Sequence, residues 1–195
     1  MKKRLFFVLI GLILLCLLCL GVGAIENRKD KAGFAVDLYD VLLDSSYFPA
    51  ALSVIIGPAK GYQDWRTLDA VGVSFKPEDY QEETYWGYTQ DVFRFDTIRL
   101  AKRDYLEQVE WYQSVYSPPG EWTFISDGAD ERYVSCRKPE NVESTHCVWI
   151  ARYGQIVVEF RGWIAPGYNT LEEMEVLVQA VDEKAVEYIP RDRDY

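Results

Sequence analysis

The chain has few of the residues on which metal sites and many catalytic sites depend. It contains one histidine, His146, and four cysteines, two of which lie in an apolar run near the N-terminus. Zinc needs three or four nitrogen or sulfur ligands, and a serine hydrolase of the α/β type carries a G-x-S-x-G turn that is missing here. The sequence also lacks a P-loop and a G-x-G-x-x-G segment. We therefore expect no metal and no cofactor.

Positive charge is also scarce. The 195 residues include 21 Lys and Arg against 31 Asp and Glu, which gives a formal net charge of −10. Nucleic-acid binding depends on a basic stripe that displaces counterions, so we expect no nucleic-acid partner. With so many acids, a pair of carboxylates is easy to find by chance. Their number alone is no evidence for a glycan hydrolase, which needs two of them across a cleft.

An uninterrupted apolar run, Leu5 to Ile25, follows the basic residues Lys2, Lys3 and Arg4. As a helix it would rise about 30 Å, enough to cross the hydrocarbon core of a bilayer. Basic residues on its N-terminal side should stay in the cytoplasm, which places the rest of the chain outside it. Two interpretations stay open: a retained signal-anchor in the cell membrane, or a signal peptide cleaved after Ala24 with secretion of the remainder.

The sequence after this run predicts a single domain. We assign residues 1–25 to the transmembrane helix or signal peptide and residues 26–34 to a charged linker. Residues 35–190 are long enough for one domain with a proper core, and 191–195 form a polar tail. No internal repeat or low-complexity tract divides the domain.

The two remaining cysteines, Cys136 and Cys147, predict one disulfide, because an even number of cysteines on the oxidising side of a membrane is usually paired. They flank a polar loop between strands expected at 132–136 and 146–153. Gly154 and Gln155 then fit a two-residue hairpin turn into a third strand at 156–164. This register pairs residues across the hairpin and places them on one apolar face: Tyr153 with Ile156, Ala151 with Val158, Trp149 with Phe160, and Cys147 with Gly162.

The opposite face of this hairpin is mixed in character. Strand alternation puts apolar and charged side chains on it, namely Val148, Ile150, Arg152, Val157, Glu159, Arg161 and Trp163. His146 should lie beside Trp163 on the same count. The pattern leaves open whether this face borders solvent or is partly covered.

Two long helices complete the predicted fold. The first begins at Asp96 or Thr97 and ends before Ser117, and the second runs from a capping box at Thr170 to about Ile189. A short helix is expected at 38–43, a buried strand at 52–56, and further strands at 71–75, 85–95 and 122–125. The predicted class is α+β: an antiparallel sheet with two main helices packed on it, preceded by the N-terminal transmembrane or signal helix.

Several segments carry a resemblance to known proteins: Phe93-Arg94-Phe95-Asp96, Ala101, Tyr105, Ala129-Asp130-Glu131, Cys136 and Cys147 to Gly154. They resemble uncharacterised bacterial cell-envelope domains, and the order of elements is similar to the PsbP/Mog1-like α+β fold. The resemblance spans roughly residues 42–189 and implies an extracytoplasmic module with a binding or accessory role. It provides no catalytic residue.

Aromatic residues suggest where a ligand could bind, since the chain has 14 Tyr and 6 Trp. Tyr85, Trp86 and Tyr88 form a candidate ligand platform, and the alternative is that these rings fill the core. We therefore expect a non-enzymatic extracytoplasmic domain that contacts the membrane through its N-terminal helix and binds an envelope ligand or protein. The alternatives are a carboxylate-based glycan hydrolase and an accessory protein-interaction or assembly factor.

Overall fold

The computed structural model describes residues 36–48, 52–57, 66–77 and 87–190. These residues belong to one compact unit, which begins at Ala35. The predicted N-terminal helix, the charged linker and the polar tail lie outside the described residues. The elements are α2 (Leu38–Val41), η1 (Ser45–Tyr47), β1 (Leu52–Gly57), β2 (Thr67–Pro77), β3 (Gly87–Phe95), α3 (Ile98–Val115), β4 (Glu131–Arg137), β5 (Thr145–Tyr153), β6 (Ile156–Ile164) and α4 (Leu171–Tyr188).

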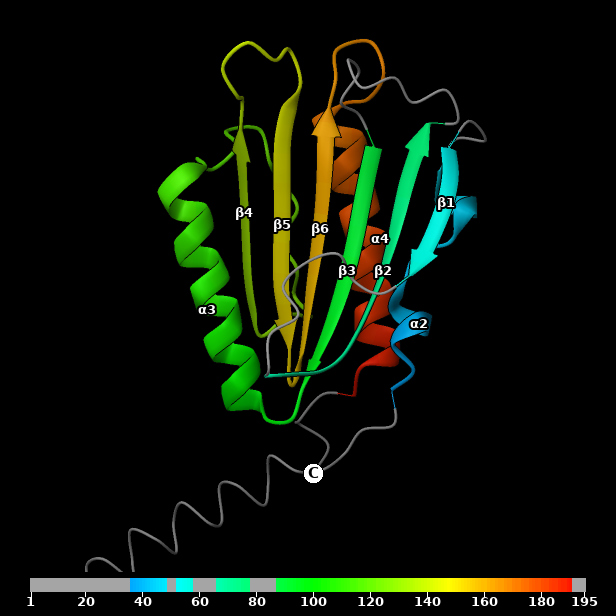
Figure 1. The fold of residues 1–195 in the computed structure, drawn as a ribbon, viewed down its shortest axis with the longest axis vertical. Helices are drawn as coiled ribbons and strands as arrows, with labels where there is room; N and C mark the ends of the chain where they lie inside the picture. Colours follow the sequence, from blue (N-terminus) through cyan, green and yellow to red (C-terminus); the bar gives the residue numbers. More distant parts are fainter. Residues whose placement is uncertain (1–35, 49–51, 58–65, 78–86, 191–195) are drawn as a thin grey trace, which may run out of the picture. The chain divides into compact units, whose positions relative to one another are not determined.

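Within the described residues, six strands form one antiparallel sheet in the order β1-β2-β3-β6-β5-β4, which confirms the α+β class (Figure 1). The predicted hairpin register is also confirmed, because Tyr153 pairs with Ile156 and Trp149 with Phe160. Gly154 in the connecting turn has φ of +57°, a conformation that glycine adopts without a steric penalty. The turn and the alternation of side chains together fix the register.

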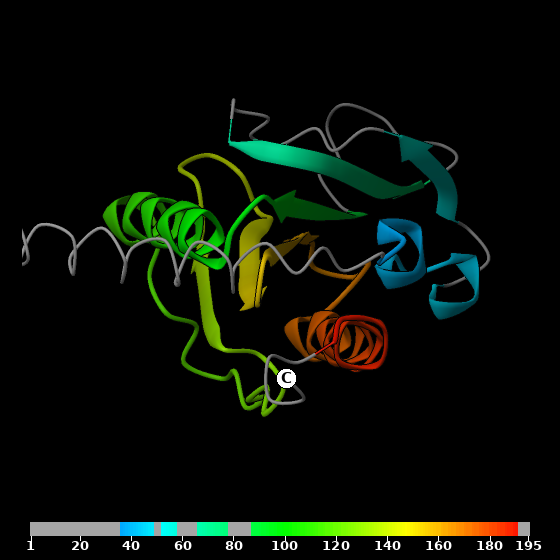
Figure 2. The same ribbon diagram turned by 90° about the horizontal axis from the view of Figure 1, so that it is seen from below.

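The two long helices cover opposite faces of the sheet, as the view from below shows (Figure 2). Strand β6 contributes to both layers because its side chains alternate. Val157 packs in a core cluster with residues of α3, whereas Gly162 lies directly under Met174 of α4. A Cβ at position 162 would lie 2.9 Å from the Met174 sulfur and 3.0 Å from the Tyr88 ring, so a side chain there would force these two side chains to move. Helix α2 packs beside α4.

Threonine caps begin both long helices, as the sequence predicts. The Thr97 side chain accepts a hydrogen bond from the Leu100 amide at the start of α3. At α4 the capping box is complete: Thr170 accepts from the Glu173 amide, and the Glu173 carboxylate accepts from the Thr170 amide. None of the helices in the described part of the chain is long and apolar enough to cross a membrane.

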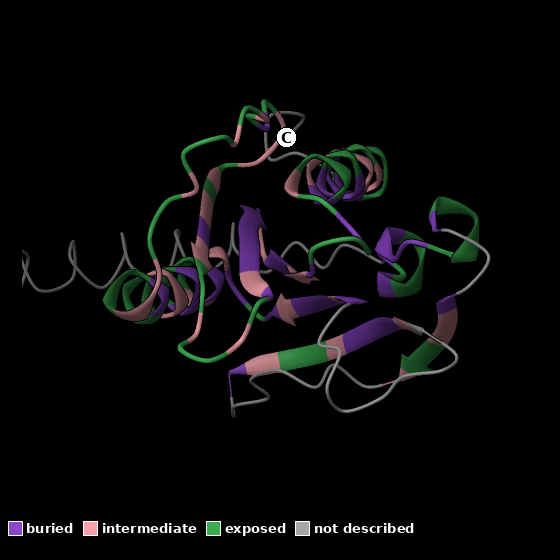
Figure 3. Ribbon diagram, turned by 90° about the horizontal axis from the view of Figure 1, so that it is seen from above, coloured by how far each residue is buried: buried purple, intermediate pink, exposed green. Residues whose placement is uncertain are grey.

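Burial follows the two helix layers. The inner strands are buried, and the surfaces of α3 and α4 that face away from the sheet are exposed (Figure 3). The mixed face of the hairpin is covered by α3, and Val148, Ile150 and Glu159 on it are buried. The sequence left this point open. Charged residues are therefore held between a helix and a sheet, where they need partners.

Two sequence expectations are wrong. Residues 52–56 were expected as a buried strand, but β1 is the edge of the sheet, and Ile55 and Ile56 are 51% and 57% exposed. The segment from Trp122 to Ile125 was expected as a strand and is an irregular loop. Its backbone amides at Thr123 and Phe124 donate to the Glu175 carboxylate of α4 instead of to a neighbouring strand.

Candidate functional site

A hollow of about 550 Å³ lies between α3 and the strands beneath it. We call it the α3 groove. One wall is a face of α3, since residues three and four apart in a helix lie on the same side. The floor is strand β6, which presents Glu159 and Arg161 on the face that α3 covers. The lining residues are Asp104, Glu107, Gln108, Trp111, Tyr112, Glu159 and Arg161.

The floor of the groove is a buried network that we call the Arg161 cluster: Asp91, Tyr112, Glu159 and Arg161. Asp91 of β3 pairs directly with Glu159 of β6, and their exposed fractions are 1% and 4%. Arg161 forms ion pairs with both carboxylates, through Nη2 to Asp91 and through Nε to Glu159 at 3.5 Å. The Tyr112 hydroxyl donates a hydrogen bond to Glu159 Oε1. Three elements therefore supply one connected polar site.

The electrostatics of this cluster favour a charged Arg161 and a protonated Tyr112. Burial lowers the pKa of Arg161, but the negative charges of Glu159 and Asp91 outweigh burial and raise it overall. Burial and the Glu159 carboxylate also raise the pKa of Tyr112, so its hydroxyl remains a donor. Two carboxylates with one guanidinium leave an excess of hydrogen-bond acceptors at the floor of the groove.

The helix wall combines a charge network with an exposed ring. Arg66 contacts Glu107 at 2.8 Å and Asp104 at 4.0 Å, and Gln108 donates to Asp104 at 2.6 Å. Hydrogen bonds from Arg103 and Arg66 lower the pKa of Glu107.

Trp111 supplies the apolar surface of the groove. Its ring is 56% exposed, and it packs edge-on against Tyr112 with the ring centres 4.8 Å apart. Because Tyr112 is buried and bonded to Glu159, it holds the indole next to the polar floor. A flat ring beside fixed polar groups is a common arrangement in ligand sites.

His146 lies beyond the groove on the same face of the sheet. It pairs with Trp163, as predicted, and the ring centres are 4.6 Å apart. Its Nδ1 is 2.7 Å from the Tyr116 hydroxyl. Burial, and then the positive charge of Arg161, lower the pKa of His146 to about 4. At neutral pH the imidazole is uncharged, so Nδ1 accepts from Tyr116 when Nε2 carries the hydrogen.

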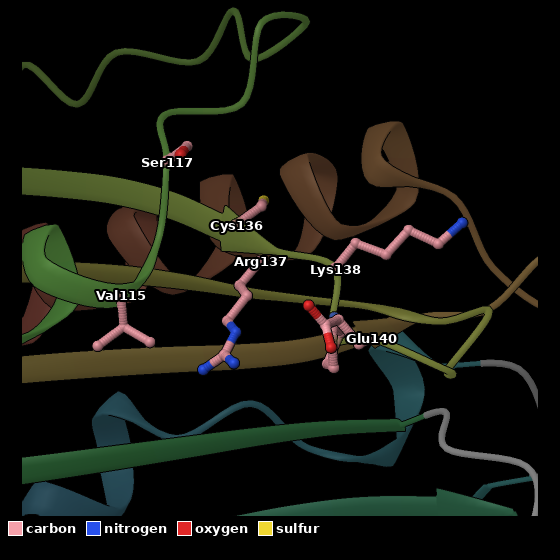
Figure 4. Close-up of a pocket in the computed structure, with 7 residues that line it drawn as sticks. Val115, Ser117, Cys136, Arg137, Lys138 and Glu140 are labelled. Carbon is pink, nitrogen blue, oxygen red and sulfur yellow. The ribbon is translucent and has the colours of Figure 1, made fainter.

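The predicted disulfide joins Cys136 of β4 to Cys147 of β5, which face each other in the register. Ser117 extends this edge, because its backbone exchanges two hydrogen bonds with Cys136. A shallow hollow of about 650 Å³ lies here, lined in part by Ser117, Arg137, Lys138 and Glu140. Figure 4 shows that the Arg137 and Lys138 side chains point in different directions, so they do not converge on one anion.

The candidate aromatic platform is only partly described. Tyr85 and Trp86 lie outside the described residues. Tyr88 faces α4, is 5% exposed, and packs against Phe160 and Phe48 with ring centres 5.7 and 5.8 Å away. The Tyr88 ring is therefore part of the core, and Tyr88 also lines a second hollow.

Sequence reasoning missed the Arg161 cluster as a site, although it placed Glu159 and Arg161 on the correct face. The signal was available in part: two opposite charges on one face of an otherwise apolar strand need buried partners. Asp91 and Tyr112 come from distant segments and meet them only through the topology. Among the described residues, no group of three or more His, Cys, Asp or Glu is arranged to hold a metal ion.

Comparisons with known proteins do not assign the chain to a family. No protein-family model matches the chain, and no curated protein matches it.

Proposed function

We propose that this chain is a non-enzymatic, extracytoplasmic binding domain of a bacterial cell envelope and that the α3 groove is its ligand site. The observation that carries the proposal is the buried Arg161 cluster under an open hollow. Burying two carboxylates and a guanidinium costs free energy that an apolar pair of similar volume would not. A fold that needed only stability could cover this face with apolar residues, as it does at Phe93 and Val157.

The chemistry of the groove favours a saccharide. A sugar ring has an apolar C–H face, which suits the exposed indole of Trp111. Its hydroxyl groups need both acceptors and donors at fixed positions. Glu159 and Asp104 supply acceptors, while Arg161 and Gln108 supply donors. The volume of about 550 Å³ falls in the usual range for small-ligand sites.

The pair of carboxylates at the floor, Asp91 and Glu159, supports binding more than hydrolysis. A glycan hydrolase places two carboxyl groups on either side of the bond to be cleaved, with space for the sugar between them. Here Asp91 and Glu159 are neighbours across two paired strands and share the guanidinium of Arg161. Asp91 does not line the groove. The two carboxylates therefore hold Arg161 in place and do not flank a substrate.

The envelope location is part of the proposal and is supported by the sequence. The apolar run after Lys2, Lys3 and Arg4 would tether the domain to the cell membrane or, if cleaved after Ala24, release it. The disulfide between Cys136 and Cys147 suits an oxidising compartment. The resemblance to bacterial envelope domains of the PsbP/Mog1-like type agrees with the same location.

Glycan binding by the full chain in detergent tests the proposal. We expect one or more glycans of an envelope-saccharide panel to bind saturably by isothermal titration calorimetry. Trp111→Ala should weaken binding by about fivefold or more, since ring stacking is worth about 1 kcal/mol or more. Leu106→Ala is the matched control, because Leu106 is exposed on the same helix and does not line the groove.

Three outcomes would contradict the proposal. Equal affinity of the wild type and Trp111→Ala would place the glycan elsewhere. Release of shortened glycan would indicate a hydrolase, and saturable binding of an envelope protein with no glycan binding would indicate an interaction factor.

A further inference from the structure

A second hollow lies on the other face of the sheet and is lined by Tyr88 and by Asn169, which bonds the Tyr88 hydroxyl. Its volume is about 280 Å³, the space of about nine water molecules at roughly 30 Å³ each. It is bordered by α4, β1 and the loop that precedes α4, so it shares no residue with the α3 groove. The lining residues are Tyr47, Leu52, Tyr88, Tyr168, Asn169, Glu173, Val176 and Leu177.

Asn169 fixes which groups donate and which accept hydrogen bonds at the base of this hollow. Its Oδ1 accepts from the Ala165 amide at 2.7 Å, and its Nδ2 donates to the Trp163 carbonyl at 2.8 Å. Turning the amide over would set an oxygen against a carbonyl and an amino group against an amide N–H, so only one orientation fits. Nδ2 therefore also donates to the Tyr88 oxygen, at 3.0 Å.

This fixed amide makes Tyr88 an acceptor and leaves its own O–H hydrogen to donate. Among the described residues, no acceptor for that hydrogen is recorded, although Tyr88 is 95% buried. Glu173 is close enough to raise the pKa of Tyr88, but the Tyr88 hydroxyl forms no hydrogen bond with its carboxylate, which accepts from the Thr170 amide through Oε2. A buried donor without an acceptor is costly, and the adjacent space is the hollow.

The remaining lining shows what kind of molecule could supply the acceptor. Tyr47, Tyr168 and Val176 are exposed around the opening, and Leu52 and Leu177 are buried beside Tyr88. This surface is mostly apolar. The Glu173 carboxylate lines the same hollow, so an anionic ligand would be repelled there.

We infer that the hollow is a ligand site for a small, neutral, mostly apolar molecule that offers one oxygen acceptor, such as a carbonyl, to the Tyr88 hydroxyl. Asn169 positions the hydroxyl, and the rings and aliphatic side chains cover the apolar part of the ligand. This inference does not depend on the function proposed for the α3 groove.

Three probes of similar size test the inference on the full chain in lipid nanodiscs: acetophenone, its hydrocarbon isostere cumene, and the anion benzoate. We expect acetophenone to bind saturably and to shift the side-chain amide signals of Asn169 in nitrogen-15 spectra. Cumene should bind about tenfold more weakly, because it cannot accept the hydrogen bond, and benzoate should not bind. Partition of a probe into the lipid does not saturate, so saturation distinguishes binding to the protein from partition.

Two variants distinguish the contribution of the Tyr88 hydroxyl to binding from that of the cavity. Tyr88→Phe keeps the ring and should weaken acetophenone about tenfold while leaving cumene unchanged. Tyr105→Phe is the matched control, because Tyr105 is equally buried but belongs to α3, on the other face of the sheet. If Tyr88→Phe does not fold, Val176→Trp fills the opening from an exposed position and should abolish binding of both probes.

The inference would be overturned if acetophenone bound no better than cumene to the wild type, or equally well to the wild type and Tyr88→Phe. Absence of any saturable probe binding would mean that the hollow holds only water, which also contradicts it.

Discussion

The two faces of the sheet are formed by the same strands but differ in the kind of side chain that they bury. On the face under α4, β6 contributes Val158 and Phe160, which pack with Trp149 and leave no charged group in that layer of the strand. On the face under α3, the same strand contributes Val157, then Glu159 and Arg161. One face is an apolar core along β6, and the other changes from apolar to ionic partway along the strand.

The difference indicates which face the fold needs for stability. Apolar burial stabilises roughly in proportion to the area removed from water. A buried ion pair loses much of its Coulomb energy to desolvation and is weak evidence for stability. Along β6, the apolar layer under α4 therefore contributes more to stability than the ionic part of the layer under α3. The ionic part of the face under α3 is better explained by a site that needs fixed charges.

Trp149→Ala should have the largest effect, because it removes the largest fully buried side chain from the face under α4. We expect a loss of about 3–5 kcal/mol in the free energy of unfolding, from lost apolar burial and the cavity left behind. Urea unfolding followed by circular dichroism measures it. Trp111→Ala, on the exposed rim of the α3 groove, should change stability by less than about 0.5 kcal/mol. Similar losses in the two variants would reject the assignment of Trp149 to the core.

Replacing both Cys136 and Cys147 by alanine should cost about 3 kcal/mol. The bond closes a short loop, with a sequence separation of 11, and it restricts the unfolded chain. Reductant added to the wild type should produce a similar loss and should leave the double variant unchanged. Alkylation of Cys136 and Cys147 themselves in the oxidised native protein, located by peptide mass mapping, would show that the bond does not form.

Much of this apolar face could be predicted from the sequence. The period of two in residues 146–164, the Gly154-Gln155 turn and the cysteine pair constrain one another, so the register followed without any knowledge of the other strands. Segment 52–56 shows the limit. A short apolar run does not reveal whether a strand is central or at an edge, and the exposure of Ile55 and Ile56 depends on which strands pair beyond it.

The ionic site could not be predicted to the same degree. Alternation placed Glu159 and Arg161 together, but their partners Asp91 and Tyr112 lie 68 and 47 residues from Glu159 along the chain. Which helix covers which face depends on the packing of the whole sheet, and local patterns do not encode it. The same holds for residues 122–125, whose backbone is bonded by Glu175 of a distant helix.

Arg161→Met should cost less than the two changes on the apolar face. It leaves two buried carboxylates without their shared cation, a change worth about 3–5 kcal/mol when the pair is fully buried. The Arg161 side chain is a quarter exposed, so we expect about 2 kcal/mol. Arg103→Met is the control, because the Arg103–Glu107 pair lies on the exposed side of α3 and should contribute less than about 0.5 kcal/mol. Equal effects of the two variants in urea unfolding would show that the Arg161 cluster is not buried in solution.

The smallest effect is a pH dependence that belongs to the α3 face alone. The pKa of His146 is about 4 in the folded protein, because burial and Arg161 disfavour the imidazolium, and an unfolded histidine has a pKa of about 6.5. Between these values the unfolded chain binds the proton and the native protein does not. Stability from this residue is therefore present above pH 6.5 and is lost as the pH falls toward 4.

The contribution of His146 is measured by comparing the wild type with His146→Gln. The free energy of unfolding of each protein is determined at pH 7 and at pH 5. The wild type should lose about 1–2 kcal/mol more than the variant over this interval, since other titrating groups are common to both. Tyr116→Phe removes the hydrogen bond to Nδ1 but keeps the imidazole buried beside Trp163, so it should retain the wild-type pH dependence. If His146→Gln and the wild type lose the same stability, the imidazole is solvated and the α3 face does not exclude water at this end. In that case the two faces differ in composition but not in how completely the helices cover them.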